Sequence, residues 1–321
     1  MIEAVNVKKY FGDKPAVAGI SFSVRKGEVL GFLGPNGAGK STTMRMITGF
    51  LPLSEGSVKI DGCDIEENPV AAKRLFGYLP ENAPSYQDMT VAGFLKFSAS
   101  IRGLRGEARE AAIARAVQLC HLEKVLNQTV DTLSKGYHHR VCFAQAILHD
   151  PPILILDEPT DGLDPNQKHE MRELIREMGK SKAIIVSTHI LEEVEAICTR
   201  VIIIDRGELV FNGTPRELRA RAPQSRVLVT LLGVDGDGAR AALEKLPSVR
   251  RVEILGREEE RVSLAVHPSD DKQKNLALEI KKALDEHSWQ FSELHTDSGR
   301  LDEVFRSLTT SDSTGRKEGA A

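Results

Sequence analysis

A glycine-rich loop that ends in lysine and serine is the strongest chemical signal in the chain. Residues 34–41 read Gly-Pro-Asn-Gly-Ala-Gly-Lys-Ser and match the pattern GxxxxGK[ST] at every fixed position. Glycines let successive backbone amides curl around one anion, and a helix that follows the loop adds its positive end. The loop therefore predicts a binding site for the phosphates of a nucleoside triphosphate.

The side chains of this loop have separate expected roles. Lys40 supplies a mobile cation for the β- and γ-phosphates, the Ser41 hydroxyl is placed to ligate Mg²⁺, and Thr42 supports the phosphates. Backbone contacts to the phosphates are expected from Gly34, Asn36, Gly37, Ala38 and Gly39. The alternative, a glycine-rich turn that matches by chance, is disfavoured because an apolar run precedes the loop and a helical run follows it.

Two carboxylates follow a second apolar run, residues 153–156. Asp157, at the carboxyl end of this expected strand, can hold Mg²⁺ through water. Glu158 comes next and can accept a proton from an attacking water or orient it. An Asp-Glu turn that only caps the next helix is the alternative, and the phosphate loop elsewhere in the chain makes it the weaker one.

A histidine follows a third apolar run, residues 183–187. The carboxyl ends of parallel strands meet at one edge of a sheet, where ligands bind. His189 is therefore expected to reach the γ-phosphate from a neighbouring strand, although a lone histidine is more often structural.

These residues need a sheet to bring them together. The apolar runs that predict its strands are residues 29–33, 153–156, 183–187 and 201–205. The stretches that predict helices between them are residues 41–48, 166–178 and 191–198. Short apolar strands that alternate with helices indicate a parallel sheet covered on both faces. A mostly helical subdomain, at about 91–150 and including a helix at 107–119, is expected as an insertion between two strands of this sheet.

The character of the chain changes near residue 220. The later strands are expected at 227–232, 252–255, 262–266 and 289–294, with helices at 238–246 and 272–284. This βαββαβ order predicts a small ferredoxin-like α+β module. We therefore assign a first domain to residues 1–220, an accessory domain to 221–310 with a linker at 223–225 and a last helix at 301–308, and a disordered tail to 311–321.

Composition excludes several classes of protein. The chain has 321 residues, 41% of them hydrophobic and 28% charged, which is an ordinary globular balance and rules out a wholly disordered chain. A net charge of −3 gives no reason to expect a nucleic-acid partner. The amino terminus lacks a secretory pattern, apolar runs are too short to span a bilayer, and the four cysteines are widely spaced. These features predict a reduced, cytosolic chain.

The segment Leu133-Ser134-Lys135-Gly136-Tyr137, placed about 20 residues before the Asp-Glu strand, resembles the signature of the ATP-binding cassette (ABC) ATPases. The resemblance covers residues 2–220, and six motifs occur in the family's order: aromatic loop, P-loop, Q-loop position, signature, Asp-Glu strand and switch histidine. It implies a P-loop NTPase cassette that binds and hydrolyses Mg-ATP.

The resemblance also implies a partner of the same kind. In the family, the signature closes over the nucleotide held by a second cassette, so Ser134 and Gly136 are expected to contact the nucleotide of a second copy in a homodimer. Asp161-Gly162-Leu163-Asp164 resembles the D-loop, which crosses that interface, and Asp164 is expected at the nucleotide. The family also stacks an aromatic ring on adenine; Phe11 is the favoured candidate, with Tyr10 or a purely structural ring as alternatives.

Two positions depart from the family pattern. The signature usually reads LSGGQ, whereas Lys135 and Tyr137 replace a glycine and the glutamine here. At the Q-loop position Glu81 stands where the family has glutamine; it is expected to ligate Mg²⁺ or to orient water, at the cost of an added charge.

The family drives transport through a separate membrane permease, so the resemblance implies a location on the cytoplasmic face of the membrane, attached through that permease. The contact is expected at residues 82–102, with Pro84, Tyr86 and Met89 as apolar candidates. The alternative is that these three side chains only pack on the helical subdomain. Glu81, the Lys-Gly-Tyr signature and a tail segment at 299–305 favour export of the ABC-2 type.

Other readings remain open. An import-type subunit has the same cassette, and the transported substrate is not encoded here. A soluble repair or chromosome ATPase is disfavoured because the chain has no heptad tract, and a translation factor is disfavoured because it has a single P-loop. The C-terminal domain has no catalytic constellation, so an interaction or dimer-stabilising role is expected, with ligand sensing as the alternative.

Overall fold

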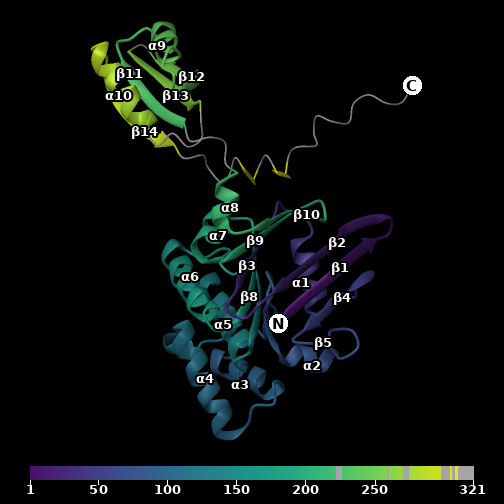
Figure 1. Cartoon of the computed structure of the whole chain (residues 1–321). Coiled ribbons are helices and arrows are strands. Elements are labelled where there is room, and N and C mark those ends of the chain that lie inside the picture. Colours follow the sequence, from purple (N-terminus) through teal and green to yellow (C-terminus); the bar gives the residue numbers. More distant parts are fainter. Residues whose placement is uncertain (222–225, 259, 270–274, 298–303, 306–307, 310–321) are drawn as a thin grey trace. The chain divides into compact units, whose positions relative to one another are not determined.

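The computed structural model describes the chain except for residues 222–225, 259, 270–274, 298–303, 306–307 and 310–321. The predicted linker and tail, most of the last predicted helix and most of the 299–305 motif lie outside the described residues. The chain divides into two compact units, Met1–Pro215 and Arg216–Ala321, and each has its own core. Figure 1 shows their elements.

The first unit is built on a six-stranded sheet in the order β10-β9-β3-β8-β7-β6. Its strands are β3 (Val29–Leu33), β6 (Phe76–Leu79), β7 (Ile153–Asp157), β8 (Ala183–Thr188), β9 (Arg200–Asp205) and β10 (Glu208–Gly213). All pairings are parallel except that of β10, which is antiparallel to β9 at one edge. Every residue of β3, β7 and β8 is buried, which explains their unbroken apolar sequences and confirms the predicted α/β sheet.

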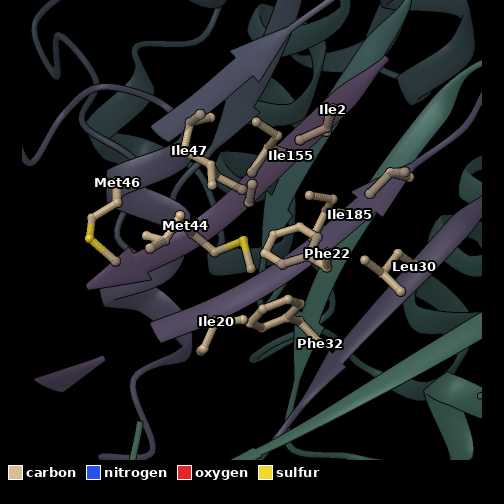
Figure 2. Packing of buried hydrophobic residues seen from close by; sticks show 14 of the residues in the cluster. Ile2, Ile20, Phe22, Leu30, Phe32, Met44, Met46, Ile47, Ile155 and Ile185 are labelled. Carbon is tan, nitrogen blue, oxygen red and sulfur yellow. The ribbon is translucent and has the colours of Figure 1, made fainter. Parts of the chain in front are cut away.

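A second, antiparallel sheet has the order β2-β1-β4-β5. Its strands are β1 (Ile2–Phe11), β2 (Lys14–Val24), β4 (Glu55–Ile60) and β5 (Cys63–Asp64). Helix α1 (Lys40–Ile47) shares one hydrophobic core with both sheets. In Figure 2, Met44 and Ile47 of α1 lie among Ile2 of this sheet and Ile155 and Ile185 of the central one. Helix α1 is thereby fixed directly behind the glycine-rich loop.

The predicted helical insertion lies between β6 and β7. It contains α3 (Val91–Ile101), α4 (Gly106–Cys120) and α5 (Lys135–Ile147), with two short 3₁₀ turns, Glu123–Val125 and Val130–Thr132, before α5. The other helices of the unit are α2 (Pro69–Arg74), α6 (Pro165–Gly179) and α7 (Leu191–Ile197). Helix α7 packs against β3 and against β8, which is the strand that precedes His189.

The second unit has the predicted βαββαβ order. Its elements are β11 (Arg226–Leu232), α9 (Gly236–Leu243), β12 (Val249–Glu258), β13 (Arg261–Pro268), α10 (Leu276–Glu286) and β14 (Gln290–Asp297); α8 (Pro215–Arg219) spans the division between units. The sheet is antiparallel throughout, in the order β12-β13-β11-β14. The two inner strands in space are the first and third in sequence, which is the ferredoxin-like arrangement.

Candidate active site

A cavity of about 470 Å³ lies beyond the carboxyl ends of β3, β7 and β8. Its lining residues are Ala16, Asn36, Gly37, Gly39, Lys40, Ser41, Thr42, Glu81, Glu158, Asp161 and His189. The motifs predicted all of these except Ala16 and Asp161. The structure thus brings the glycine-rich loop, the Q-loop position, the Asp-Glu strand and the histidine to one hollow.

The lysine of the loop is folded back onto the loop itself. Lys40 Nζ donates hydrogen bonds to the carbonyl oxygens of Gly34, at 2.7 Å, and Pro35, at 3.2 Å. The side chain is buried, and this burial lowers the pKa of Lys40, while the carboxylates of Glu158, Asp157 and Glu81 oppose the shift. Because Lys40 also lines the cavity, an anion bound there can replace the two carbonyl partners.

Two glycines of the loop are held in the left-handed region, Gly37 at φ +82° and Gly39 at φ +104°. Gly39 also has no room for a side chain, because a Cβ there would lie 2.5 Å from the carbonyl oxygen of Ala16. At Gly34 a Cβ would lie 2.4 Å from the carbonyl oxygen of Ile204. The curled backbone that can cradle an anion therefore depends on glycine at these positions.

Two hydroxyl groups, one from α1 and one from β8, meet the Asp157 carboxylate at the end of β7. Ser41 Oγ donates to Asp157 Oδ1 at 3.3 Å, and Ser187 Oγ donates to the same carboxylate oxygen. Hydroxyl and carboxylate oxygens are the donors that Mg²⁺ takes in proteins, usually with phosphate oxygens and water completing the shell. Within the described residues no cluster of three or more His, Cys, Asp or Glu side chains is arranged to hold a metal by itself.

Glu158 and His189 form a pair at the cavity wall. His189 Nδ1 lies 3.1 Å from both Glu158 Oε1 and Oε2. Burial raises the pKa of Glu158, and the hydrogen bond from His189 partly offsets this. Glu158 has a left-handed backbone (φ +51°), and its amide donates to Ser187 Oγ at 3.2 Å and to the Ser187 carbonyl at 3.1 Å. A carboxylate held in this way can accept a proton from a bound water or orient it.

The signature residues do not line this cavity. The Ser134 side chain caps α5 and accepts a hydrogen bond from the Tyr137 amide at 3.4 Å. Gly136 is packed against Gln167, since a Cβ at Gly136 would lie 2.1 Å from Gln167 Oε1. Within one chain, Gly136 therefore faces Gln167 of α6, and neither Ser134 nor Gly136 lines the cavity that holds the P-loop.

Two further predicted contacts also lie outside the cavity lining. Asp164 caps α6, where its carboxylate accepts a hydrogen bond from the Gln167 amide at 3.0 Å. Phe11 is 56% exposed, and Lys9 Nζ lies 5.6 Å from the centre of its ring. Their roles toward nucleotide stay predictions.

Asp161 is the charged lining residue that the motifs did not single out. Its amide donates to the Glu158 carbonyl at 3.1 Å, so a tight turn returns the chain to the cavity directly after the Asp-Glu strand. The signal was present in the D-loop resemblance, where we favoured Asp164. Ala16, on β2, is brought to the cavity by the antiparallel sheet and has no local signal.

The expected permease contact is partly exposed. Tyr86 is 56% exposed, and its ring packs edge-on against Phe97 of α3 at 5.1 Å between centroids. Pro84 is exposed and Met89 partly so. These side chains lie in the segment between Glu81 and α3.

Comparison with known proteins gives the family. A family model described as "ABC transporter" matches residues 17–161. The linearmycin resistance ATP-binding protein LnrL of Bacillus subtilis (strain 168) is 32% identical over 312 residues, which cover 96% of this chain and 98% of that protein. The Nod factor export ATP-binding protein I of Burkholderia orbicola (strain AU 1054) is 37% identical over 68% of this chain and 72% of its own length.

A solved structure agrees with these relatives. The dimeric structure of MJ0796, a bacterial ABC transporter cassette, superposes with a TM-score of 0.63 at 25% identity and covers 67% of this chain and 99% of that one. The match in sequence over nearly the whole length, together with the fold and the motif order, leads to one conclusion. The chain belongs to the ATP-binding subunits of ABC transporters, the ATPases coupled to transport.

Proposed function

We propose that the chain hydrolyses ATP in this cavity with Glu158 as the residue that orients or deprotonates the attacking water. The observation that carries the proposal is the pair formed by Glu158 and His189, which faces the same cavity as Lys40. A general base contributes on the order of 10²–10⁴ in rate. His189 keeps the Glu158 carboxylate aimed and is expected to contact the γ-phosphate.

The donor set at the end of β7 fits a magnesium ion. Ser41, Asp157 and Glu81 would hold Mg²⁺, which when bound supplies positive charge to the phosphate oxygens. Lys40 exchanges its carbonyl partners for phosphate oxygens, and the amides from Gly34 to Gly39 with Thr42 complete the cradle. Ser187 fixes the Asp157 carboxylate so that one of its oxygens has a defined direction.

Two chains are proposed to act together. Ser134, Gly136 and Asp164 lie away from the cavity of their own chain, so they can serve a nucleotide only across an interface with a second copy. The similarity to a cassette solved as a dimer supports this arrangement. Phe11, exposed at the end of β1 in the antiparallel sheet, is proposed to stack on adenine.

A separate membrane permease is the proposed partner. In the described residues no helix is long and apolar enough to cross a membrane. Relatives named for Nod factor export and linearmycin resistance support export as the direction. The cassette is proposed to act at the cytoplasmic face of the membrane, attached through its permease. The exposed ring of Tyr86 is the proposed centre of that contact. Residues 221–310 are proposed as an accessory domain that stabilises the dimer, and nothing in the charge balance favours a nucleic-acid partner.

The Glu158→Gln variant tests the catalytic assignment. The amide keeps the shape of the side chain but cannot act as a base, so ATP binding is expected to persist while steady-state hydrolysis falls roughly 10²-fold or more. Wild-type turnover by this variant would remove Glu158 from the mechanism.

A further inference from the structure

A fully buried carboxylate lies behind the catalytic loops. Glu193 of α7 has 0% exposure. Thr188 Oγ1 donates to one of its carboxylate oxygens at 2.7 Å, and Thr160 Oγ1 donates to the other. Both hydroxyls belong to residues that are themselves buried.

The two threonines flank the catalytic pair in sequence. Thr160 follows Glu158 by two residues, and Thr188 directly precedes His189. Glu193 is therefore a single carboxylate that joins the loop carrying the base to the loop carrying the histidine.

We propose that Glu193 is a positioning residue that fixes the register between Glu158 and His189. In the described part of the chain the imidazole of His189 hydrogen-bonds to Glu158 alone, and its side chain is 48% exposed. Its position therefore depends on its backbone, which continues from Thr188. Thr188 Oγ1 also accepts a hydrogen bond from the Ile190 amide at 3.0 Å, so it holds the backbone on both sides of the histidine.

Energetics favour one arrangement of this network. A buried carboxylate that loses a partner is costly, and hydrogen bonds to a charged acceptor are the stronger kind. Arg172 Nη2, 3.6 Å from Glu193 Oε1, supplies the compensating charge from α6. Separating the loops would leave part of the carboxylate unsatisfied, so the network resists changes in their spacing.

The consequence is kinetic. A displacement of about 1 Å at reacting groups can cost on the order of 10² in rate. Loosening the network should therefore reduce kcat, while the glycine-rich loop, which supplies none of the hydrogen-bond or ion-pair partners of Glu193, keeps its affinity for nucleotide. The inference rests on the proposed role of Glu158.

The test compares Glu193→Gln with Glu28→Gln in the full chain. Glu28 is also a poorly exposed carboxylate, held by Arg200 and by the Arg25 amide, and it does not line the cavity. We expect Glu193→Gln to lower kcat roughly 10- to 100-fold with KM for ATP unchanged. Glu28→Gln should keep kcat even where its loss of Tm is as large. Equal kcat losses in the two variants would overturn the proposal.

Thr188→Val provides a second arm should Glu193→Gln fold poorly. It removes the hydroxyl from the other side of the same hydrogen bond, so its kcat should fall, and combining it with Glu193→Gln should add little. Losses that multiply would mean that the two residues act separately, against the proposal. The Glu158→Gln variant distinguishes failure of the role proposed for Glu158 from failure of the role proposed for Glu193. If Glu158→Gln stays active, both roles are wrong. If Glu158→Gln is inactive while the Glu193 variants keep their kcat, only the role of Glu193 is wrong.

Discussion

Lys135 Nζ lies 3.0 Å from Asp161 Oδ2, so the signature segment and the wall of the cavity are joined within one chain. The stem of the lysine covers Gly162, where a Cβ would lie 2.0 Å from Nζ. Lys135 is the position where the family pattern has glycine. The ion pair lowers the pKa of Asp161, mainly through the hydrogen bond from Lys135.

Replacing Lys135 with glycine restores the family residue and removes this pair. Both partners are exposed, at 67% and 55%, so the free energy of unfolding should change by at most about 1 kcal/mol. Urea denaturation at low and high salt measures the change. A larger loss that persists at high salt would show that the contact with Gly162 and the lower helix propensity of glycine at the start of α5 matter more than the charges.

Much of this site could be predicted from the sequence, because the strands that position it are buried on both faces of the sheet. The runs at residues 153–156 and 183–187 contain almost only apolar residues, and each leads into polar residues that the sheet brings to a common edge. The antiparallel sheet was largely missed, since β1 mixes exposed and buried positions and has irregular register near Asn6, where φ is +47°.

Glu193 and Asp161 were missed for a different reason. Their importance comes from contacts with residues far along the chain, Thr160 and Lys135 respectively. A glutamate in an acidic helix such as residues 191–197 has no local pattern that indicates full burial.

Gly37 and Gly39 form a matched pair for testing the loop. A Cβ at Gly37 meets nothing within 4 Å, so Gly37→Ala should cost only the left-handed conformation, about 1–2 kcal/mol. At Gly39 the Cβ also clashes with the carbonyl oxygen of Ala16, which is fixed by the backbone. Gly39→Ala should therefore lower the free energy of unfolding by roughly 1–3 kcal/mol more than Gly37→Ala. Chemical denaturation of both variants measures the difference. Equal losses would contradict the close contact with Ala16.

Buried histidines should make the first unit less stable in acid. Burial lowers the pKa of His139 to about 4 from its ordinary 6.5, and in the described part of the chain neither ring nitrogen has a hydrogen-bond partner. Below pH 6.5 the imidazole of His139 binds a proton in the unfolded chain but stays neutral in the folded chain. The free energy of unfolding therefore decreases as the pH is lowered from 6.5 to about 4.

The His139→Leu variant should lose less of its free energy of unfolding than the wild type between pH 6.5 and 5, by at most about 2 kcal/mol. The free energy of unfolding at several pH values is the measurement. An unchanged slope would mean that the ring of His139 finds a partner in solution. Burial also lowers the pKa of His149 to about 4, so some decline should remain in the variant.

Removal of the Ser41 hydroxyl tests the metal assignment. Ser41→Ala deletes one of the two oxygen donors that meet at Asp157. The Mg²⁺ concentration needed for half-maximal hydrolysis should rise roughly tenfold or more. Binding of ATP in the presence of EDTA should stay unchanged, since the loop amides and Lys40 remain. If both quantities change equally, Ser41 acts on the nucleotide and not on the metal.

In the proposed mechanism, ATP is held between the P-loop of one chain and the signature of another. Light scattering of Glu158→Gln with Mg-ATP, followed by counting of bound nucleotide, tests it most directly. We expect a dimer that retains two ATP molecules and that reverts to monomers when Ser134 is also replaced by a bulky residue. A variant that stays monomeric while saturated with Mg-ATP, or a dimer that ignores the Ser134 substitution, would contradict it.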